Sequence, residues 1–318
     1  MRYAVFTVDV DRDVNVAEQG RYDAASTVRG EETSSFRTES SARGLSMLVD
    51  LLEELRIRGT FFLEGDTLRA IDKKVDVREL LSGHEVGCHG VCHEDITGES
   101  TGICLTGPEI ESVVSESASI VKDVTGTRPS GFRAPYLHTN SETLSILAKE
   151  GFKYDSSKTV DIKQGRVGPY RLDEGLWELP VARGLDARGK RIVSYLWPMH
   201  EGKRRPDDYL DMALGLKKGC LVMATHSWHM VETYGGGVLD EQQVADNLAH
   251  VRRVLEGVRD LGLEFHSASE AVDLVVPGDR EGRAQVRRTR LLRRGRDSRR
   301  ATSIESPRDL AGNWKVIG

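Results

Sequence analysis

The chain has 318 residues, of which 38% are hydrophobic and 30% are charged, a composition typical of a globular protein with a sizeable core. No apolar run is long enough for a membrane span, and four cysteines without a secretory leader argue against a disulfide framework. We therefore expect a cytoplasmic protein without a membrane span.

The charge divides the chain into two parts. The net charge is −5 in total, but residues 277–318 hold twelve Lys and Arg against five Asp and Glu, which leaves −12 for residues 1–276. We predict one folded domain over residues 1–276 and an arginine-rich tail over residues 277–318 that is disordered or loosely packed. Such a tail can contact nucleic acid, although a solvated extension explains this composition better.

The first predicted strand covers residues 3–10 and ends in two carboxylates. Side chains two positions apart on a strand point the same way, so Asp9 and Asp11 share one face and the valines beside them share the other. Two carboxylates that face inward at a strand end are costly unless a cation or a reaction uses them. Residues 12–40 follow as a polar stretch without periodicity, which we expect to be a loop that covers a functional site.

Helices and strands then alternate along the chain. The predicted helices cover residues 45–57, 75–81, 109–124, 144–150 (capped by Ser141) and 241–261, and the predicted strands cover residues 60–63, 131–136, 152–154, 177–181, 192–195, 220–225 and 263–266. One further strand ends directly before His89. This order describes a parallel sheet or a (β/α) barrel. Because chemistry-bearing residues lie at the ends of at least four strands, we favour the barrel.

The stretch from Val86 to His93 is the strongest chemical signal in the sequence. His89 and His93 lie four residues apart, a spacing at which two imidazoles can converge on one metal ion. Two imidazoles alone do not hold a divalent ion, and the carboxylates of Asp9 and Asp11 are the best source of a third ligand. One carboxylate and two neutral imidazoles form an open site for Zn²⁺ or a similar ion, such as Co²⁺, Ni²⁺ or Mn²⁺.

The remaining polar residues at strand ends suit hydrolysis of an amide. A second carboxylate that does not bind the metal can take a proton from water, and a separate histidine can protonate the leaving amine. His226 follows the predicted strand 220–225, and Arg133 lies in the strand 131–136. The competing interpretations are a chance histidine pair on a solvated helix, a Cys/His zinc knuckle, and an Arg133 that makes an ordinary ion pair.

With these residues in view, the sequence resembles the polysaccharide deacetylase family, also called NodB-homology or carbohydrate esterase 4-like proteins. The resemblance rests on five segments, in order: residues 7–11, 59–63, 89–93, 132–136 and 224–228. It implies a distorted, seven-stranded (β/α) barrel and a metal held by Asp11, His89 and His93. It further implies that Asp9 is the catalytic base, that Arg133 braces it, and that His226 is the general acid. Pro135, Tyr136 and Trp228 are then expected to contact substrate.

Two features depart from the usual family pattern. The two aspartates of the first motif are most often adjacent, whereas here Val10 separates Asp9 from Asp11. The family's fourth motif, an Asp and a Trp that polarise the acid histidine and shape the groove, is not clear here. We assign Asp155 to orient His226 and Trp177 to contact substrate, with Asp161 as an alternative to Asp155.

We therefore predict a metal-dependent hydrolase that removes an acetyl group from an N-acetylated sugar or related amide, either small or oligomeric. The alternatives are a hydrolase of a cyclic amide or ureide on the same scaffold, and a non-catalytic protein that binds carbohydrate or nucleic acid. His229 is the rival to His226 as the acid. Cys88 and Cys92 are expected to be packing residues. An oligomer is compatible with the sequence.

Overall fold

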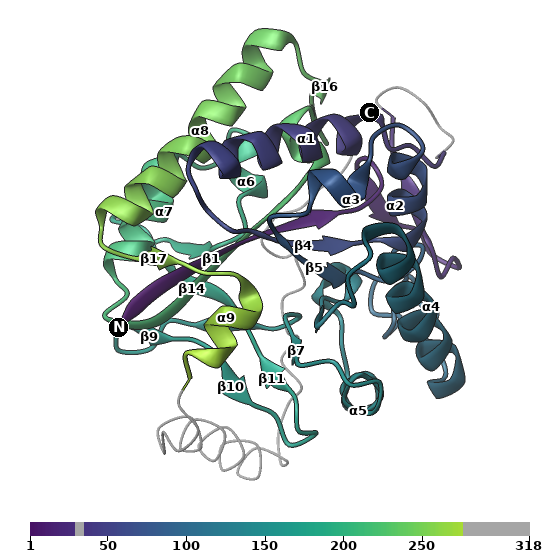
Figure 1. Cartoon of the computed structure of the whole chain (residues 1–318). Coiled ribbons are helices and arrows are strands. Elements are labelled where there is room, and N and C mark those ends of the chain that lie inside the picture. Colours follow the sequence, from purple (N-terminus) through teal and green to yellow (C-terminus); the bar gives the residue numbers. More distant parts are fainter. Residues whose placement is uncertain (29–34, 276–318) are drawn as a thin grey trace. The chain divides into compact units, whose positions relative to one another are not determined.

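The computed structural model describes residues 1–28 and 35–275, and this part is built around one curled sheet (Figure 1). Seven parallel strands form its centre, in the spatial order β7 (Tyr154–Asp155), β6 (Gly131–Phe132), β5 (Glu85–Cys88), β4 (Thr60–Leu63), β1 (Arg2–Val10), β14 (Lys218–His226) and β12 (Val181–Leu185). The predicted α/β fold is confirmed, in the form of a distorted half-barrel. The predicted tail, residues 277–318, lies outside the described residues.

Shorter strands extend this sheet to 13 strands in the described part of the chain. They are β8 (Thr159–Asp161), β9 (Arg166–Val167), β10 (Tyr170–Arg171), β11 (Trp177–Glu178), β13 (Arg191–Val193) and β17 (Glu264–Phe265). Two small hairpins stand apart from it: β2 (Asn15–Ala17) with β3 (Ala24–Ser26), and β15 (Glu232–Thr233) with β16 (Gly237–Val238).

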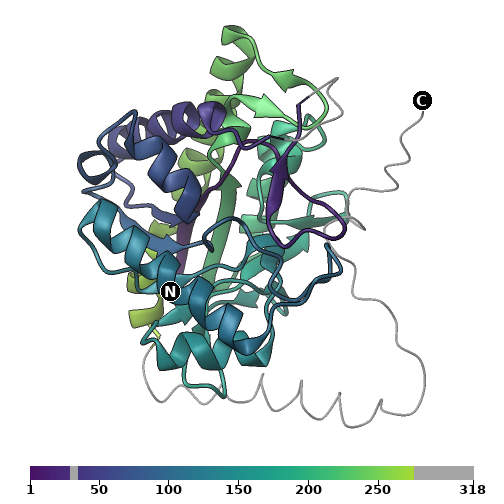
Figure 2. The ribbon, with the colours of Figure 1, turned by 90° about the vertical axis from the view of Figure 1, so that its right-hand side faces the viewer.

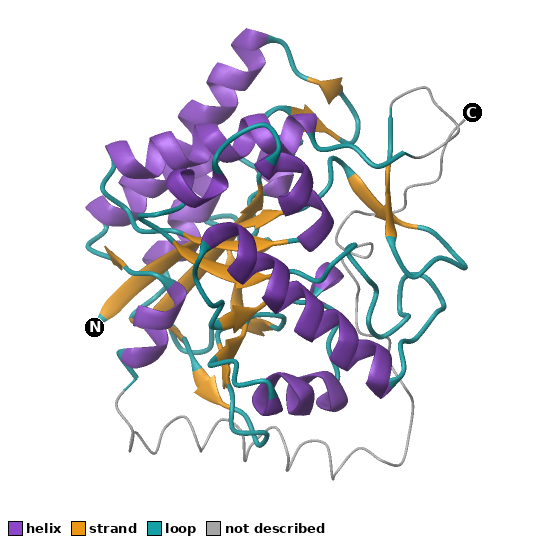
Figure 3. Ribbon diagram, turned by 45° about the vertical axis from the view of Figure 1, so that its right-hand side comes forward, coloured by secondary structure: helices purple, strands orange, loops and turns teal. Residues whose placement is uncertain are grey.

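Most of the helices cover the outer face of the sheet (Figure 3), whereas the last one packs against the inner cluster through Ala268, Ala271 and Val272. The helices are α1 (Glu39–Glu54), α2 (Gly65–Asp72), α3 (Val77–Leu80), α4 (Gly107–Thr125), α5 (Ser141–Lys149), α6 (Trp197–His200), α7 (Pro206–Leu214), α8 (Glu241–Asp260) and α9 (Ala268–Asp273). Two 3₁₀ turns, η1 (Pro135–Leu137) and η2 (Trp228–Met230), follow β6 and β14. Within the described ranges, no helix is both long and apolar enough to cross a membrane.

The alternation along β1 determines what faces the inside of the half-barrel. Phe6 and Val8 pack in the large core between sheet and helices, together with residues of α1 and α8. Tyr3 and Val5 belong to the smaller inner cluster instead. Since side chains two apart share a face, the inner row continues through Thr7 and Asp9 to the end of the strand. The sequence pattern predicts this orientation, and it places the carboxylates inside the sheet's curve.

The inner face is packed tightly enough to require glycine on a neighbouring strand. A Cβ atom on Gly131 would lie 2.0 Å from the ring of Tyr154, and one on Gly87 would lie 2.7 Å from the ring of Phe62. Large side chains on one strand are thus accommodated by missing side chains on the next. This packing fixes the spacing of β5 and β6, whose carboxyl ends carry His89 and Arg133.

The structure departs from the sequence-based prediction mainly between the central strands. The stretch 12–40 is not entirely loop, because it contains the β2–β3 hairpin, seen in purple in Figure 2. Helices α2, α6, α7 and α9 were not predicted, since each is short and has fewer than three turns over which periodicity can be read. Asn140, rather than Ser141, caps α5, and its side chain accepts a hydrogen bond from the Thr143 N–H at 2.9 Å.

Candidate metal centre and active site

Three side chains that could bind a metal converge at the carboxyl ends of β1 and β5. Asp11 follows β1, and His89 and His93 follow β5. One potential ligand atom from each lies within 4.8 Å of the other two, and all three residues are buried. The Asp11 Oδ2 atom lies 3.3 Å from His93 Nε2 and 4.0 Å from His89 Nε2. The structure thus brings together the three residues that the motifs had grouped.

A tight loop, rather than a helical turn, gives the two histidines their convergence. Gly90 has φ +76°, and His93 itself has φ 60°. A Cβ atom on Gly90 would lie 2.3 Å from a carboxylate oxygen of Glu94, so glycine is required there for space as well as for conformation. The ring of Tyr136 packs edge-on against the His93 ring at 4.6 Å and holds its orientation.

Hydrogen bonds and burial leave the two imidazoles suited to bind a cation. His89 Nδ1 donates to the Arg133 carbonyl oxygen at 2.7 Å, which leaves Nε2 with its lone pair toward Asp11. Burial is the largest influence on both rings: it lowers the pKa of His89 below its usual value and that of His93 to about 3. Both imidazoles are therefore neutral, the form that binds metals.

The carboxylate of Asp11 lacks the partners that a buried charge requires. Its side chain is 0% exposed, its Oδ1 has no hydrogen-bond partner in the described part of the chain, and burial raises its pKa to about 6. Its Oδ2 accepts a hydrogen bond from the Asn15 amide at 2.7 Å. A cation at this position would neutralise the charge, and about 3.3 Å between ligand atoms is expected for tetrahedral zinc. The residues fit a divalent metal.

A second carboxylate, Asp9, lies beside the metal triad with its own set of partners. Arg133 is fully buried, and its guanidinium donates to Asp9 Oδ1 at 2.7 Å and to Thr7 Oγ1 at 2.8 Å. Ser156 holds the same guanidinium through its backbone carbonyl and its hydroxyl. Burial alone would raise the pKa of Asp9, but Arg133, the His89 and His226 rings and the Tyr195 hydrogen bond together outweigh burial, and the pKa is lowered. Asp9 is ionised.

Tyr195 connects Asp9 to the histidine at the end of β14. Its hydroxyl donates a hydrogen bond to Asp9 Oδ2 and lies 3.2 Å from His226 Nε2. The same Nε2 lies 3.7 Å from Asp11 Oδ2. Burial lowers the pKa of His226 to about 4. The candidate base Asp9 and the candidate acid His226 therefore lie next to each other and next to the metal triad.

Helix α1 supports the segment that carries His226. Gly44 faces the Ser227 carbonyl so closely that a Cβ atom would lie 1.9 Å from its oxygen. The hydroxyls of Ser41 and Ser227 lie 2.5 Å apart, and the Ser227 N–H donates to the Asp9 carbonyl at 3.0 Å. These contacts fix the turn after β14 against both β1 and the helix.

The predicted role of Asp155 does not match its contacts. Asp155 ends β7, fully buried, where it accepts a hydrogen bond from the Ser157 hydroxyl at 2.6 Å, and burial raises its pKa. The group that faces Nδ1 of His226 is His229, at 3.1 Å. The sequence could not show whether Asp155 lies near His226, because an aspartate at a strand end gives no information about which residues of other strands it contacts. The alternative, Asp161, forms ion pairs with Arg183 and Arg191.

The predicted substrate contacts divide into two groups. Tyr136 contacts His93, Pro135 is buried beside it, and Trp228 stacks on His226 with 5.3 Å between ring centroids. Trp177 is on β11, where Arg171 lies over its ring at 5.5 Å. None of the contacts recorded for Trp177 in the described ranges involves the metal triad.

Sequence reasoning missed Tyr195, Asn15 and also Glu201, whose Oε1 atom lies 3.5 Å from Nε2 of His229. Tyr195 ends a predicted strand and so had a usable signal, namely a polar tip at the same end as the other site residues. Asn15 lies in the stretch that was taken as loop, and Glu201 follows a short helix that was not predicted. The residue pattern around Asn15 and around Glu201 gives no information about which distant side chains these two residues contact.

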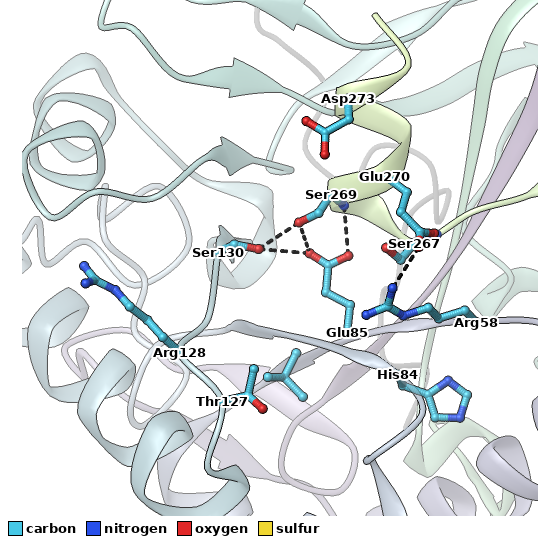
Figure 4. Close-up of a pocket in the computed structure, with 11 residues that line it drawn as sticks. Arg58, His84, Glu85, Thr127, Arg128, Ser130, Ser267, Ser269, Glu270 and Asp273 are labelled. Atoms are coloured by element: carbon cyan, nitrogen blue, oxygen red, sulfur yellow. Dashed lines mark hydrogen bonds and ion pairs between the residues drawn. The ribbon is translucent and has the colours of Figure 1, made fainter.

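A cavity of about 200 Å³ lies at the opposite, amino end of the sheet (Figure 4). Glu85, which starts β5, lines it with its carboxylate held by the hydroxyls of Ser130 and Ser269 and by the Ser269 N–H. Tyr154 and Thr60 add two more hydroxyl donors at 3.0 and 3.1 Å. This cavity is separate from the metal triad, and its carboxylate is fully satisfied.

Comparison with known proteins agrees with this geometry. Residues 41–154 match the family model of polysaccharide deacetylases. Over this segment the chain is similar to polysaccharide deacetylases. The matched segment includes His89, His93 and Arg133, while Asp9, Asp11 and His226 lie outside it.

Individual relatives cover less of the chain. A peptidoglycan deacetylase of Helicobacter pylori is 30% identical over 152 residues, which are 45% of this chain and 50% of that protein. A peptidoglycan deacetylase-like protein of Gibberella zeae is 30% identical over 135 residues, or 42% of this chain and 36% of that protein. The chain thus spans half or less of the length of these curated relatives.

A similar fold is known from a solved structure. A protein of Mycobacterium smegmatis that is assigned to the polysaccharide deacetylases superimposes with a TM-score of 0.57 and 21% identity. The superposition covers 95% of this chain and 94% of that one. At 21% identity, this similarity shows that the two proteins share a fold.

Proposed function

We propose that this protein is a metal-dependent hydrolase that removes an acetyl group from an N-acetylated sugar or a closely related amide. The observation that carries the proposal is the set of buried ligand atoms of Asp11, His89 and His93. The ionised Asp9 and the His226 ring beside them supply the proton-transfer groups that amide hydrolysis requires. The match of residues 41–154 to the polysaccharide deacetylase family supports the substrate class.

The metal's contribution is general to such sites. A divalent cation held by two imidazoles and one carboxylate acts as a Lewis acid on an acyl carbonyl and on water. Zinc suits this ligand set, and cobalt, nickel and manganese bind similar sets. The remaining chemistry falls to the side chains of this chain.

Asp9 is the proposed base. Its carboxylate accepts the proton that water loses as it attacks the acyl carbon. Arg133 keeps Asp9 ionised and holds its Oδ1, and Tyr195 holds its Oδ2. General base catalysis by a positioned group contributes a factor of roughly 10² to 10⁴.

His226 is the proposed acid. Its Nε2 is the ring nitrogen that faces Asp11 and the Tyr195 hydroxyl, so it is the one that reaches a substrate bound there. Because burial keeps this ring neutral, Nε2 must gain a proton before it gives one to the leaving nitrogen. The Tyr195 hydroxyl touches both groups, so the proton taken up by Asp9 has a hydrogen-bonded path to His226.

The test is acetate release by the zinc-loaded full chain from N-acetylglucosamine oligomers and from the single N-acetylated sugar. Release that stops after chelation and returns with added metal supports the proposal. A zinc-loaded chain that releases no acetate from either compound, yet opens a cyclic ureide or imide, would assign the same site to the alternative hydrolase.

A further inference from the structure

A second imidazole lies directly behind the proposed acid. His229, in the turn η2, is 0% exposed, and its Nδ1 lies 3.1 Å from Nδ1 of His226. Its other nitrogen, Nε2, lies 3.5 Å from the Oε1 atom of Glu201, whose side chain is 6% exposed. Glu201 Oε1 is held by the Tyr234 N–H at 2.8 Å. The three side chains form a row that leads away from the metal triad.

The contact between two Nδ1 atoms restricts where protons can lie. Burial lowers the pKa of His229 well below its usual value, so this ring is neutral and carries a proton on one nitrogen only. If that proton were on Nδ1, His226 Nδ1 would have to be bare, and His226 could not carry protons on both nitrogens. A histidine that protonates a leaving group through Nε2 must keep its Nδ1 proton. His229 must then accept at Nδ1 and carry its own proton on Nε2.

We propose that His229 and Glu201 position the acid of this enzyme: His229 accepts the His226 Nδ1–H, and Glu201 holds the His229 proton on Nε2. The inference rests on the proposed function, since it assigns partners to the acid of that reaction. It replaces the role first given to Asp155. It also assigns His229 a positioning role rather than that of acid, because its two nitrogens face His226 and Glu201.

A neighbouring histidine shows what a purely structural imidazole looks like in this fold. His200 is also buried and stacks on His229 at 5.4 Å, but both its nitrogens are paired, with Asn247 at 2.6 Å and Thr225 at 2.9 Å. His229 Nε2, by contrast, is buried and has no hydrogen bond of ordinary geometry in the described ranges; Glu201 is the charged group that faces it. A packing role leaves that atom unexplained.

The first test is a nitrogen spectrum of the zinc-loaded full chain labelled with ¹⁵N in histidine. Such a spectrum separates protonated from bare ring nitrogens, and the His229→Asn variant identifies the signals of His229. The proposal predicts a proton on Nε2 and a bare Nδ1 at position 229. A proton on Nδ1 there overturns it, whatever the activity of the protein.

The second test compares an amide with an activated ester. His229→Leu removes the acceptor at similar volume, and we expect kcat on an N-acetyl sugar to fall by about 10²-fold. Hydrolysis of 4-nitrophenyl acetate, whose leaving group needs no proton, should change by less than about threefold. His229→Asn keeps an oxygen near the position of Nδ1 and should restore most of the amide rate. Glu201→Gln should lower kcat on the N-acetyl sugar by about tenfold relative to the wild type, with KM and zinc content unchanged.

The control is His200→Gln, which disturbs a buried imidazole without touching His226. It should lower the melting temperature but leave the ratio of amide to ester rates as in the wild type. Equal losses on both compounds in His229→Leu, or an unchanged amide rate, would overturn the proposal. A wild-type chain inactive on both compounds defeats the proposed function instead, and the nitrogen spectrum still decides the hydrogen-bond assignment.

Discussion

The two ends of strand β5 carry buried polar groups in opposite states. At the amino end, every contact that Glu85 makes comes from neutral hydroxyls or a backbone N–H, and both its oxygens are occupied. At the carboxyl end, Asp11 Oδ1 and His93 Nδ1 have no hydrogen-bond partner among the described residues. The fold can therefore satisfy a buried carboxylate with its own groups, as it does for Glu85, but it leaves Asp11 Oδ1 unpaired.

This contrast explains why burial alone does not identify a site. Both ends have low exposure, and a cavity is found at the structural end (Figure 4). What separates them is whether the polar atoms are paired within the protein. An unpaired carboxylate beside two neutral imidazoles requires something from outside the chain, and a divalent cation fits.

The largest expected effect is at the carboxyl end of β5, where the polar atoms lack hydrogen-bond partners. His89→Ala removes one of three ligands, and we expect zinc affinity to fall by more than about 10²-fold, with loss of acetate release. Metal analysis of dialysed protein beside the wild type measures this. Equal metal content in the two proteins would mean that His89 is not a ligand.

Asp9→Asn separates the proton-transfer group from the metal ligands. The substitution keeps the shape of the side chain but removes the base, so kcat should fall by about 10²- to 10⁴-fold while bound zinc stays at the wild-type level. Steady-state kinetics together with metal analysis decide the matter. A variant that loses its metal would assign Asp9 to coordination instead.

The matched change at the other end of β5 is Glu85→Gln. It turns one acceptor oxygen into a donor that faces hydroxyls, and we expect the free energy of unfolding to fall by about 1–3 kcal/mol. Zinc affinity and kcat should remain as in the wild type. Denaturant unfolding measures the first, and a change in metal affinity would show that the two ends of the strand are coupled.

A smaller effect is expected at the buried Asp155–Glu178 pair, which is a third kind of carboxylate site. Burial is the main cause that raises the pKa of Glu178 well above 4.5, and the nearby carboxylate of Asp155 is the second. A group whose pKa is higher in the folded state than in the unfolded state stabilises the fold fully at pH values below its unfolded-state pKa. This stabilisation is lost as the pH rises toward its folded-state pKa. Wild-type stability relative to Glu178→Gln should therefore decline above about pH 4.5, by at most about 1.4 kcal/mol per pH unit. Unfolding curves of both proteins at a series of pH values measure the difference; parallel pH profiles would contradict a raised pKa of Glu178.

Sequence reasoning recovered the parts of the site that lie on regular strands. A period of two places Asp9, on β1, and Asp11, directly after it, on one face, and the motif spacing groups them with His89 and His93. It failed where a contact depends on a turn or a distant neighbour. Tyr195 reaches Asp9 across 186 positions of the sequence, and Asn15 reaches Asp11 from a hairpin in a stretch without periodicity.

The central claim is tested most directly by titrating the metal-free full chain with zinc in a calorimeter, alongside Asp11→Asn. The account predicts one ion per wild-type chain, and a variant whose affinity is lower by at least about 10²-fold while its fold is retained. Equal stoichiometry and affinity in the two proteins would show that Asp11 does not hold the cation.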